Sequence, residues 1–290
     1  MRRALSAFLL SVVACGTLHA AEYAIQLTRP VTIGTRYDLD TLAVIEESGT
    51  IKTGEESQES ESNVTLRFHA TGEVFDVDNK GREIRTIYSI RSCTRTTGGE
   101  TAELLPEGTL LTVWTEHGDL RFQLPDGEVA GNATDVLGLL VPVFKGGRDD
   151  DEVFGTRRPQ RPGSSWPVNK EAAVADLKAK RFFTEPRHLQ GNSRLVGITN
   201  TNNIDCLKIV SEVSIRQLTV PLPDSLRVET GTVRAEITGL YPLDPRKGRL
   251  QEINRVTLSM QIKGNSPGQG AETTIDSTMN RTVTRSFRFH

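Results

Sequence analysis

The sequence predicts a mainly β protein of the α+β type, in which long antiparallel hairpins form a curved sheet or half-barrel and two short helices flank a central irregular segment. Apolar residues recur at every second position through most of the chain, which is the period of a strand with one buried face. Turns rich in Gly, Asn and Asp join these segments, as in hairpins. Helical spacing occurs in two places, 133–145 and 170–181.

Strands dominate the first half of the chain. The expected strands lie at 22–27, 35–47, 64–71, 84–90, 110–115 and 120–124. Residues 51–62 are instead expected to form a solvated, mobile loop, because glutamates alternate there with Ser and Gln. Segments 64–71 and 84–90 flank the turn 78–81, Asp-Asn-Lys-Gly, so we expect them to pair as a long hairpin.

An apolar helix is expected at the end of the first half, over 133–145. Val136, Leu140 and Phe144 recur there at helical spacing, and Pro142 should distort the last turn. The apolar face of this helix is nearly continuous. The helix must therefore be covered by other elements or lie in a groove.

A long irregular segment, 146–167, joins two halves, 21–145 and 168–290, which we expect to form one β-rich domain. Prolines interrupt this segment and push the residues before them out of the helical region. Its acidic run, 149–152, is expected to be a solvated loop, which the three arginines that follow could neutralise. Trp166 is expected either to plug the end of the core or to line a binding surface.

The second half begins with a surface helix, 170–181, that Asn169 can cap. Alternating segments follow at 193–199, 204–218, 226–238, 256–262 and 273–290. Several of these arms exceed the usual strand length of about 5–6 residues. Long arms with one polar face imply a strongly twisted sheet that curves.

The stretch 241–250, Tyr-Pro-Leu-Asp-Pro-Arg-Lys-Gly-Arg-Leu, is followed by an alternating strand and a last long strand. This pattern, together with the gross order of elements, resembles uncharacterised exported proteins of the bacterial envelope whose architecture is similar to the lipoprotein-carrier fold. The resemblance implies a curved antiparallel half-barrel with helices over its concave side, and a concave apolar face that binds acyl chains. No functional residue carries over, because no position-specific motif matches.

Residues 1–20 have the form of a signal peptide. Arg2 and Arg3 precede an apolar stretch, 4–14, that is too short to span a bilayer. Two processing routes stay open. Cleavage after Ala20 would make the protein periplasmic or secreted, whereas acylation of Cys15 would anchor it as a lipoprotein.

Two further cysteines, Cys93 and Cys206, stand one in each half of the chain. In an exported protein an even pair favours a disulfide, here one that would link the two halves. The alternative is two separate buried thiols. Nothing in the surrounding sequence marks either cysteine as a nucleophile.

Composition and motifs disfavour several chemistries. The net charge of −2 produces no field that would attract nucleic acid. No two histidines stand at metal-ligand spacing, and no phosphate-binding loop, dinucleotide fingerprint or nucleophile elbow occurs. We therefore assign no catalytic residue, no metal and no cofactor.

The first functional hypothesis is a non-enzymatic exported binding protein that holds a lipid or another hydrophobic ligand under a helix-covered sheet. The residues expected to line its cavity are Val136, Leu140, Phe144, Leu258 and Met260. An interior filled by side chains would contradict this hypothesis. The second hypothesis is a structural or protein-interaction domain of the cell envelope with a solid core, and the third is a hydrolase.

Overall fold

One antiparallel sheet of thirteen strands runs through the whole described chain, and it is curved without closing on itself. The computed structural model describes residues 21–129, 132–265 and 272–290, so the expected signal peptide and Cys15 lie outside the described residues. Along the sheet the strands follow the order β7-β6-β5-β3-β2-β1-β13-β12-β11-β10-β9-β8, and β4 pairs with β3 beside this path. This architecture confirms the predicted fold class.

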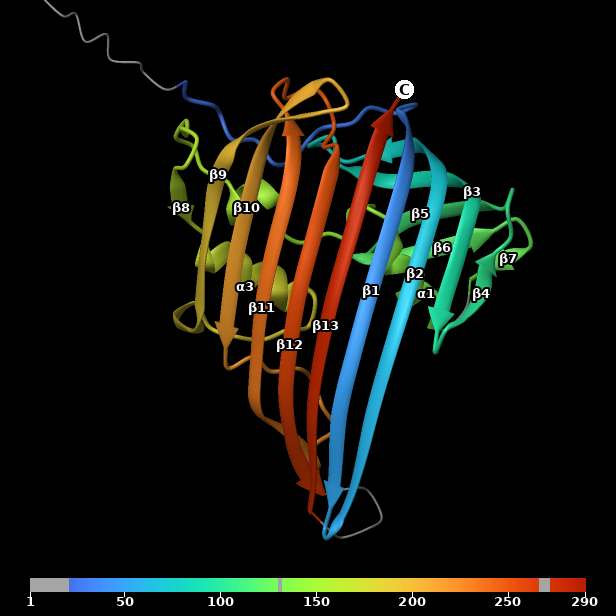
Figure 1. Ribbon diagram of the computed structural model, residues 1–290, viewed down its shortest axis with the longest axis vertical. Coiled ribbons are helices and arrows are strands. Elements are labelled where there is room, and N and C mark those ends of the chain that lie inside the picture. The colour runs from blue at the N-terminus through green and yellow to red at the C-terminus, as the bar shows by residue number, and fades with distance from the viewer. Residues whose placement is uncertain (1–20, 130–131, 266–271) are drawn as a thin grey trace, which may run out of the picture.

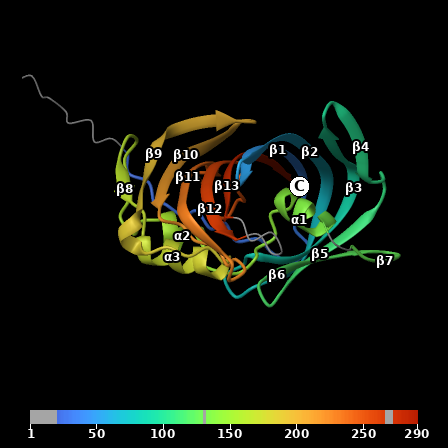
Figure 2. The same cartoon turned by 90° about the horizontal axis from the view of Figure 1, so that it is seen from below.

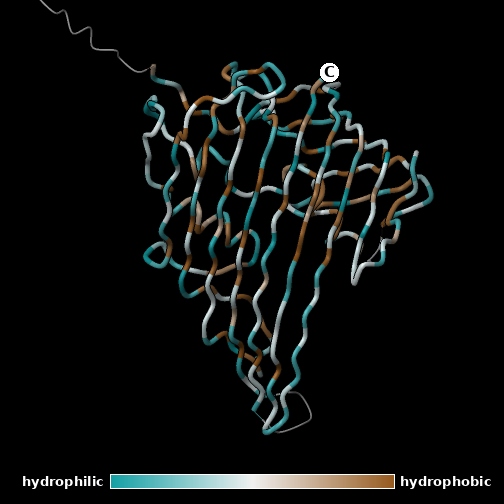
Figure 3. The backbone as a smooth tube through the Cα atoms, viewed as in Figure 1, coloured by the Kyte–Doolittle hydropathy of each residue, from teal (hydrophilic) through white to brown (hydrophobic). Residues whose placement is uncertain are grey.

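The strands of the first half are β1 (Arg36–Thr53), β2 (Glu56–Val77), β3 (Glu83–Thr97), β4 (Glu100–Leu105), β5 (Leu110–Glu116), β6 (Asp119–Leu124) and β7 (Gly127–Glu128). Those of the second half are β8 (Ser165–Pro167), β9 (Leu189–Thr201), β10 (Ile204–Arg216), β11 (Leu226–Pro242), β12 (Gln251–Asn265) and β13 (Glu272–Phe289). Figure 3 shows hydrophobic and hydrophilic residues following one another along the long strands. The predicted strand at 22–27 is wrong, because only Tyr23 pairs there, in an isolated bridge with Gln160.

The two halves of the chain join where β1 pairs with β13 at the centre of the sheet. The register runs from Tyr37 opposite Phe289 to Thr53 opposite Thr273. Residues that are opposite one another in this ladder share a face of the sheet. The odd-numbered residues of β13 therefore face the same side as the buried Tyr37 and Leu39, which is the concave side.

The expected loop at 51–62 is instead the end of the longest hairpin. β1 and β2 pair without interruption to Thr53 and Glu56, and β2 alone has 22 residues, or about 70 Å of extended chain. The neighbouring strand β13 pairs with β1 as far as Thr53 and so supports this hairpin. Figure 1 shows that the long central strands run past the helices into a narrow tip.

Three helices lie on the concave side of the sheet: α1 (Asn132–Leu140), α2 (Asp150–Phe154) and α3 (Lys170–Ala179). Seen from below, α1 lies inside the curve of the first-half strands, whereas α2 and α3 lie beside β9 to β12 (Figure 2). The predicted helix 133–145 is correct only to Leu140, because Pro142 cannot continue it. Asn169 caps α3 as predicted, since its side chain accepts a hydrogen bond from the Ala172 amide at 3.2 Å. A short 3₁₀ helix, η1 (Pro186–His188), precedes β9.

The buried core on the concave face is divided between the two halves of the sheet. Beneath α1 a large cluster packs around residues such as Tyr37, Leu66 and Leu140. In the other half a smaller cluster gathers around Trp166, whose indole NH donates to the Phe154 carbonyl at 2.7 Å. Trp166 thus plugs the core, the first of the two roles expected for it.

Candidate ligand-binding cavity

A cavity of about 680 Å³ lies between the two core regions. Its floor is the concave face of β11, β12 and β13, and its roof is the connector, which we define as residues 141–169 between α1 and α3. The end of α1, the N-terminal residues 27–31 and the start of β3 complete the wall. This part of the concave side is therefore not filled by side chains.

Acidic residues fix the connector above the sheet. Asp149 caps α2 through the Glu152 amide at 2.8 Å and pairs with Lys80 at 2.6 Å. Asp151 accepts hydrogen bonds from the Leu27 and Thr28 amides at 2.7 and 3.0 Å. The expectation of a solvated loop at 149–152 is therefore wrong.

The physical reason is that carboxylates in one helix turn point in different directions. Asp149 and Glu152 reach Lys80, whereas Asp151 reaches the amides of residues 27 and 28. Glu152 pairs with Lys80 at 2.8 Å and with Arg148 at 2.9 Å. The arginines that were expected to neutralise the run do not contact it; Arg161 instead pairs with Glu22 at 2.9 Å.

Apolar side chains cover a large part of the cavity wall. Phe144 of the connector lines it, and the guanidinium of Arg82 lies 3.6 Å from the centre of the Phe144 ring. On the floor, Ile237, Val256 and Val283 stand on three neighbouring strands and face the same space. These groups can hold the apolar part of a ligand.

A fully paired acidic site occupies one side of the wall. Glu83 accepts hydrogen bonds from the hydroxyls of Tyr37 at 2.8 Å, Tyr88 at 3.0 Å and Thr86 at 2.5 Å. The two tyrosine hydroxyls also lie 2.9 Å apart. Burial raises the pKa of Glu83, although these hydroxyl donors oppose the shift. Gly72 gives both rings room, because a Cβ there would lie 2.9 Å from the Tyr88 ring.

A second paired network lies on the floor around Glu252, which is 7% exposed. Its carboxylate accepts from Arg285 at 2.9 Å and from Asn254 at 2.6 Å, and it also contacts Arg249. Burial alone would raise the pKa of Glu252, but Arg249 and Arg285 together lower it below its ordinary value. Arg285 is held further by the Leu139 carbonyl at 2.7 Å.

Two cations beside this network have no acidic partner. Within the described chain, Arg281 forms no ion pair, and its Nε is buried without a hydrogen-bond partner. Lys145 is exposed to the cavity, and its Nζ donates only to the Gly138 carbonyl, at 2.8 Å. The surrounding protein, followed by the charges of Arg285 and Arg281, lowers the pKa of Lys145 to about 8.

The charges that line the cavity are unbalanced. Eight basic and five acidic side chains line it, an excess of three positive charges, whereas the whole chain carries a net charge of −2. Two of these acids, Glu83 and Asp150, have pKa values that desolvation raises above their ordinary values. The cavity is thus a local positive region in a slightly acidic protein.

The five residues predicted to line a cavity are not brought together. Phe144 lines the cavity, but Leu140 is fully buried in the core and Val136 packs against the same core. Leu258 packs against the core on the α3 side, and Met260 lies farther along β12 toward the tip. The position of Phe144 depends on the path of the connector, and helical spacing in the sequence does not predict that path.

The predicted Cys93–Cys206 disulfide is wrong. Both thiols are free and buried, Cys93 on β3 and Cys206 on β10. Five strands, β2, β1, β13, β12 and β11, separate these two positions in the sheet, which is far beyond the reach of a disulfide. The alternative of two separate buried thiols is the one that the structure shows.

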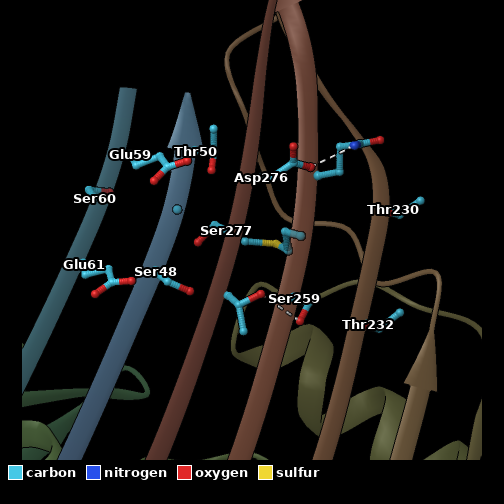
Figure 4. A pocket seen from close by; sticks show the side chains of 14 residues that line it. Ser48, Thr50, Glu59, Ser60, Glu61, Thr230, Thr232, Ser259, Asp276 and Ser277 are labelled. Atoms are coloured by element: carbon cyan, nitrogen blue, oxygen red, sulfur yellow. Dashed lines mark hydrogen bonds between the residues drawn. The ribbon is translucent and has the colours of Figure 1, made fainter. Parts of the chain in front are cut away.

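A different kind of hollow lies near the tip, across β2, β1, β13, β12 and β11 (Figure 4). Its lining is polar, and carboxylates such as Glu59, Glu61 and Asp276 stand among serines and threonines. Asp276 accepts a hydrogen bond from Gln261 at 2.8 Å. This hollow offers no apolar surface comparable to that of the cavity, so we do not assign the ligand to it.

No catalytic or metal-binding arrangement emerges among the residues that the structure describes. No group of three or more His, Cys, Asp or Glu side chains there could hold a metal ion. His290 and the Thr71 hydroxyl both contact Asp38, at 3.3 and 2.8 Å, so the carboxylate lies between them. A hydrolytic triad needs the histidine in that middle position. No helix in the described part of the chain is long and apolar enough to cross a membrane.

No family model matches this sequence, and no curated protein matches it. Among solved structures, a DUF1329 family protein from Desulfovibrio piger is 12% identical, with 84% of each chain covered and a TM-score of 0.20. The outer membrane protein OprG from Pseudomonas aeruginosa is 10% identical, with 88% of this chain and 96% of that chain covered and a TM-score of 0.19.

A putative outer membrane lipoprotein-sorting protein domain from Vibrio parahaemolyticus is 11% identical, with 90% of this chain and 88% of that chain covered and a TM-score of 0.12. TM-scores this low do not establish a common fold, so the cavity must be interpreted from its own side chains.

Proposed function

We propose that this protein is an exported, non-enzymatic binding protein that holds a hydrophobic or lipid-like ligand between the sheet and the connector. The observation that carries the proposal is the cavity of about 680 Å³ under the connector. Its volume is within the range of about 300–1,000 Å³ that is typical of small-molecule sites. It would act in the periplasm, outside the cell, or anchored to the envelope through Cys15.

The apolar groups of the wall supply the binding energy in this proposal. A ligand that buries about 200 Å² of apolar surface gains about 5 kcal/mol from leaving water, before the costs of association. Phe144 is already held in place by the Arg82 guanidinium and by the hydrogen bond from its amide to the Glu83 carbonyl at 2.9 Å. A ligand would therefore meet a largely preformed wall.

The test is the native mass of the protein purified from the envelope of its own host, before and after denaturation. We expect a bound small mass that leaves on denaturation. Val256→Phe should fill the floor of the cavity and reduce the bound fraction, whereas Val210→Phe, on the opposite face of β10, should not. An apo mass that does not change when amphiphiles are added would contradict the proposal.

A second candidate function, a protein-interaction domain of the envelope, is favoured by the tip. The long central strands run beyond the helices, and Ile51 there is 43% exposed. Shortening the hairpin on both sides of the turn at Gly54 would remove this surface without touching the cavity. Unchanged ligand occupancy with loss of a binding partner would assign the two functions to different regions.

A further inference from the structure

Arg281 is a half-buried cation on the floor of the cavity, and the described residues leave it without a counterion. It stands on β13 between Met279 and Val283 on the concave face, opposite Val256 of β12. Its nearest charged neighbour on the strand, Arg285, is already paired with Glu252. Arg281 therefore stands among apolar groups and another cation on this face. The Nε atoms of Arg281 and Arg285 both lack a hydrogen-bond partner, but of the two only Arg285 has a carboxylate partner among the described residues.

Lys145 approaches the same place from the connector above. Four charged groups act on its charge, and three of them are cations: Arg285 and Arg281 of β13, Lys180 at the C-terminal end of α3, and Asp135 of α1. Lys180 pairs with Asp176 at 2.6 Å. Of the described acids in this region, Asp176 is thus paired with Lys180, and Asp135 is the one acid that acts on Lys145 beside three cations.

We propose that the cavity binds the anionic head group, a phosphate or a carboxylate, of a single-chain amphiphile, and that Arg281 and Lys145 form the head-group site. This inference rests on the proposed function and names the class of ligand. A guanidinium and an ammonium that face one space from opposite walls suit an oxyanion, because both donate charge-assisted hydrogen bonds. Val256, Val283 and Phe144 lie beside the two cations and would contact the chain.

An unpaired cation at an apolar wall lowers stability, because desolvation disfavours its charge. A ligand anion would remove this penalty on binding. The same residues would then explain both the imbalance of charge in the free protein and the preference for a charged ligand. A structural role for Arg281 would instead require a partner in the free protein, and the described residues offer it none.

The experiment is titration calorimetry of the full exported protein with three probes: dodecyl phosphate, the neutral glycerol monolaurate, and inorganic phosphate. We expect dodecyl phosphate to bind about 10- to 100-fold more tightly than the neutral probe, the range given by charge-assisted hydrogen bonds. Arg281→Met and Lys145→Met should each reduce the affinity for dodecyl phosphate about tenfold more than the affinity for the neutral probe. Arg288→Met, an exposed position on the other face of β13, is the matched control.

The outcomes separate the two proposals. Equal affinity for the charged and neutral amphiphiles, or a preference that survives both Arg281→Met and Lys145→Met, would overturn the head-group site while the binding function stands. Inorganic phosphate that binds as tightly as dodecyl phosphate would overturn the assignment to an amphiphile. Failure of every amphiphile to bind the wild type would overturn the proposed function itself. If Arg281→Met does not fold, Lys145→Met on the connector gives the same test.

Discussion

Two polar sites on the wall of one cavity differ in how completely they are paired. Glu83 accepts hydrogen bonds from three hydroxyls, two of them on fully buried tyrosines. Each of these hydroxyls therefore has a hydrogen-bond partner. Arg281 and Lys145 have no acid opposite them. Buried polar groups that serve the fold are normally satisfied, whereas unsatisfied ones require another explanation. The comparison predicts that the first site serves stability and supports the proposal that the second site binds a ligand.

The largest effect is expected at Glu83. Glu83→Ala removes the acceptor of three hydroxyls and should lower the free energy of unfolding by about 3 kcal/mol, because buried donors without partners are costly. Glu83→Gln keeps an acceptor and should lose less than half as much. Urea unfolding of both variants measures this, with the exposed Glu46→Ala as control. A loss of less than 1 kcal/mol in Glu83→Ala would show that the site does not support the fold.

The next effect is a pH dependence at Lys145. A lysine whose pKa falls from 10.5 to about 8 on folding binds fewer protons folded than unfolded within that interval. The free energy of unfolding should therefore rise with pH between about 8 and 10.5, relative to Lys145→Met. Because Lys145 is exposed to the cavity, solvent screening reduces the effect to about 1 kcal/mol. Parallel pH profiles for the two proteins would contradict this account.

Arg281→Met should raise the free energy of unfolding of the apo protein by about 1 kcal/mol, because it replaces an unpaired cation with an apolar side chain of similar length. Thermal and urea unfolding measure the change. Arg285→Met is the matched variant on the same face, and it should lower stability because it leaves Glu252 with one arginine fewer. Equal losses in the two variants would remove the distinction between paired and unpaired cations.

The smallest effect is expected for reduction. Cys93 and Cys206 are free thiols in separate parts of the core, so a reducing agent should leave the melting temperature unchanged. Alkylation of the denatured, unreduced protein should label both cysteines. A protein two hydrogens lighter, with neither thiol labelled, would show a disulfide and contradict the arrangement of the sheet.

The sequence predicted the sheet well, because alternation such as that of Leu66 to Ala70 reports directly which face of a strand is buried. It failed at residues 51–62, where composition indicated a loop. Hydrogen bonds from the neighbouring strand β13, more than two hundred residues away in the chain, make this segment a hairpin. Local composition contains no information about such a partner.

The site was predicted less well than the fold, because it depends on the connector. Phe144 was chosen for its helical spacing, yet it lines the cavity only because the chain leaves the helix before Pro142. Arg281 was missed although a signal was present. In the last strand Arg281 alternates in step with Val283 and Phe287, so a basic residue stands on an apolar face. Such a residue needs either a partner or a ligand.

The most direct test of the central claim is the shift in melting temperature that dodecyl phosphate causes in wild type, Arg281→Met and Arg288→Met. A ligand at about 100 times its Kd adds about 2.7 kcal/mol, which raises the melting temperature of a protein of this size by about 5 °C or more. We expect that shift in wild type and Arg288→Met, and a much smaller one in Arg281→Met, which should start from a higher melting temperature. The same shift in all three proteins, or a lower starting temperature in Arg281→Met, would show that Arg281 serves the fold and not the ligand.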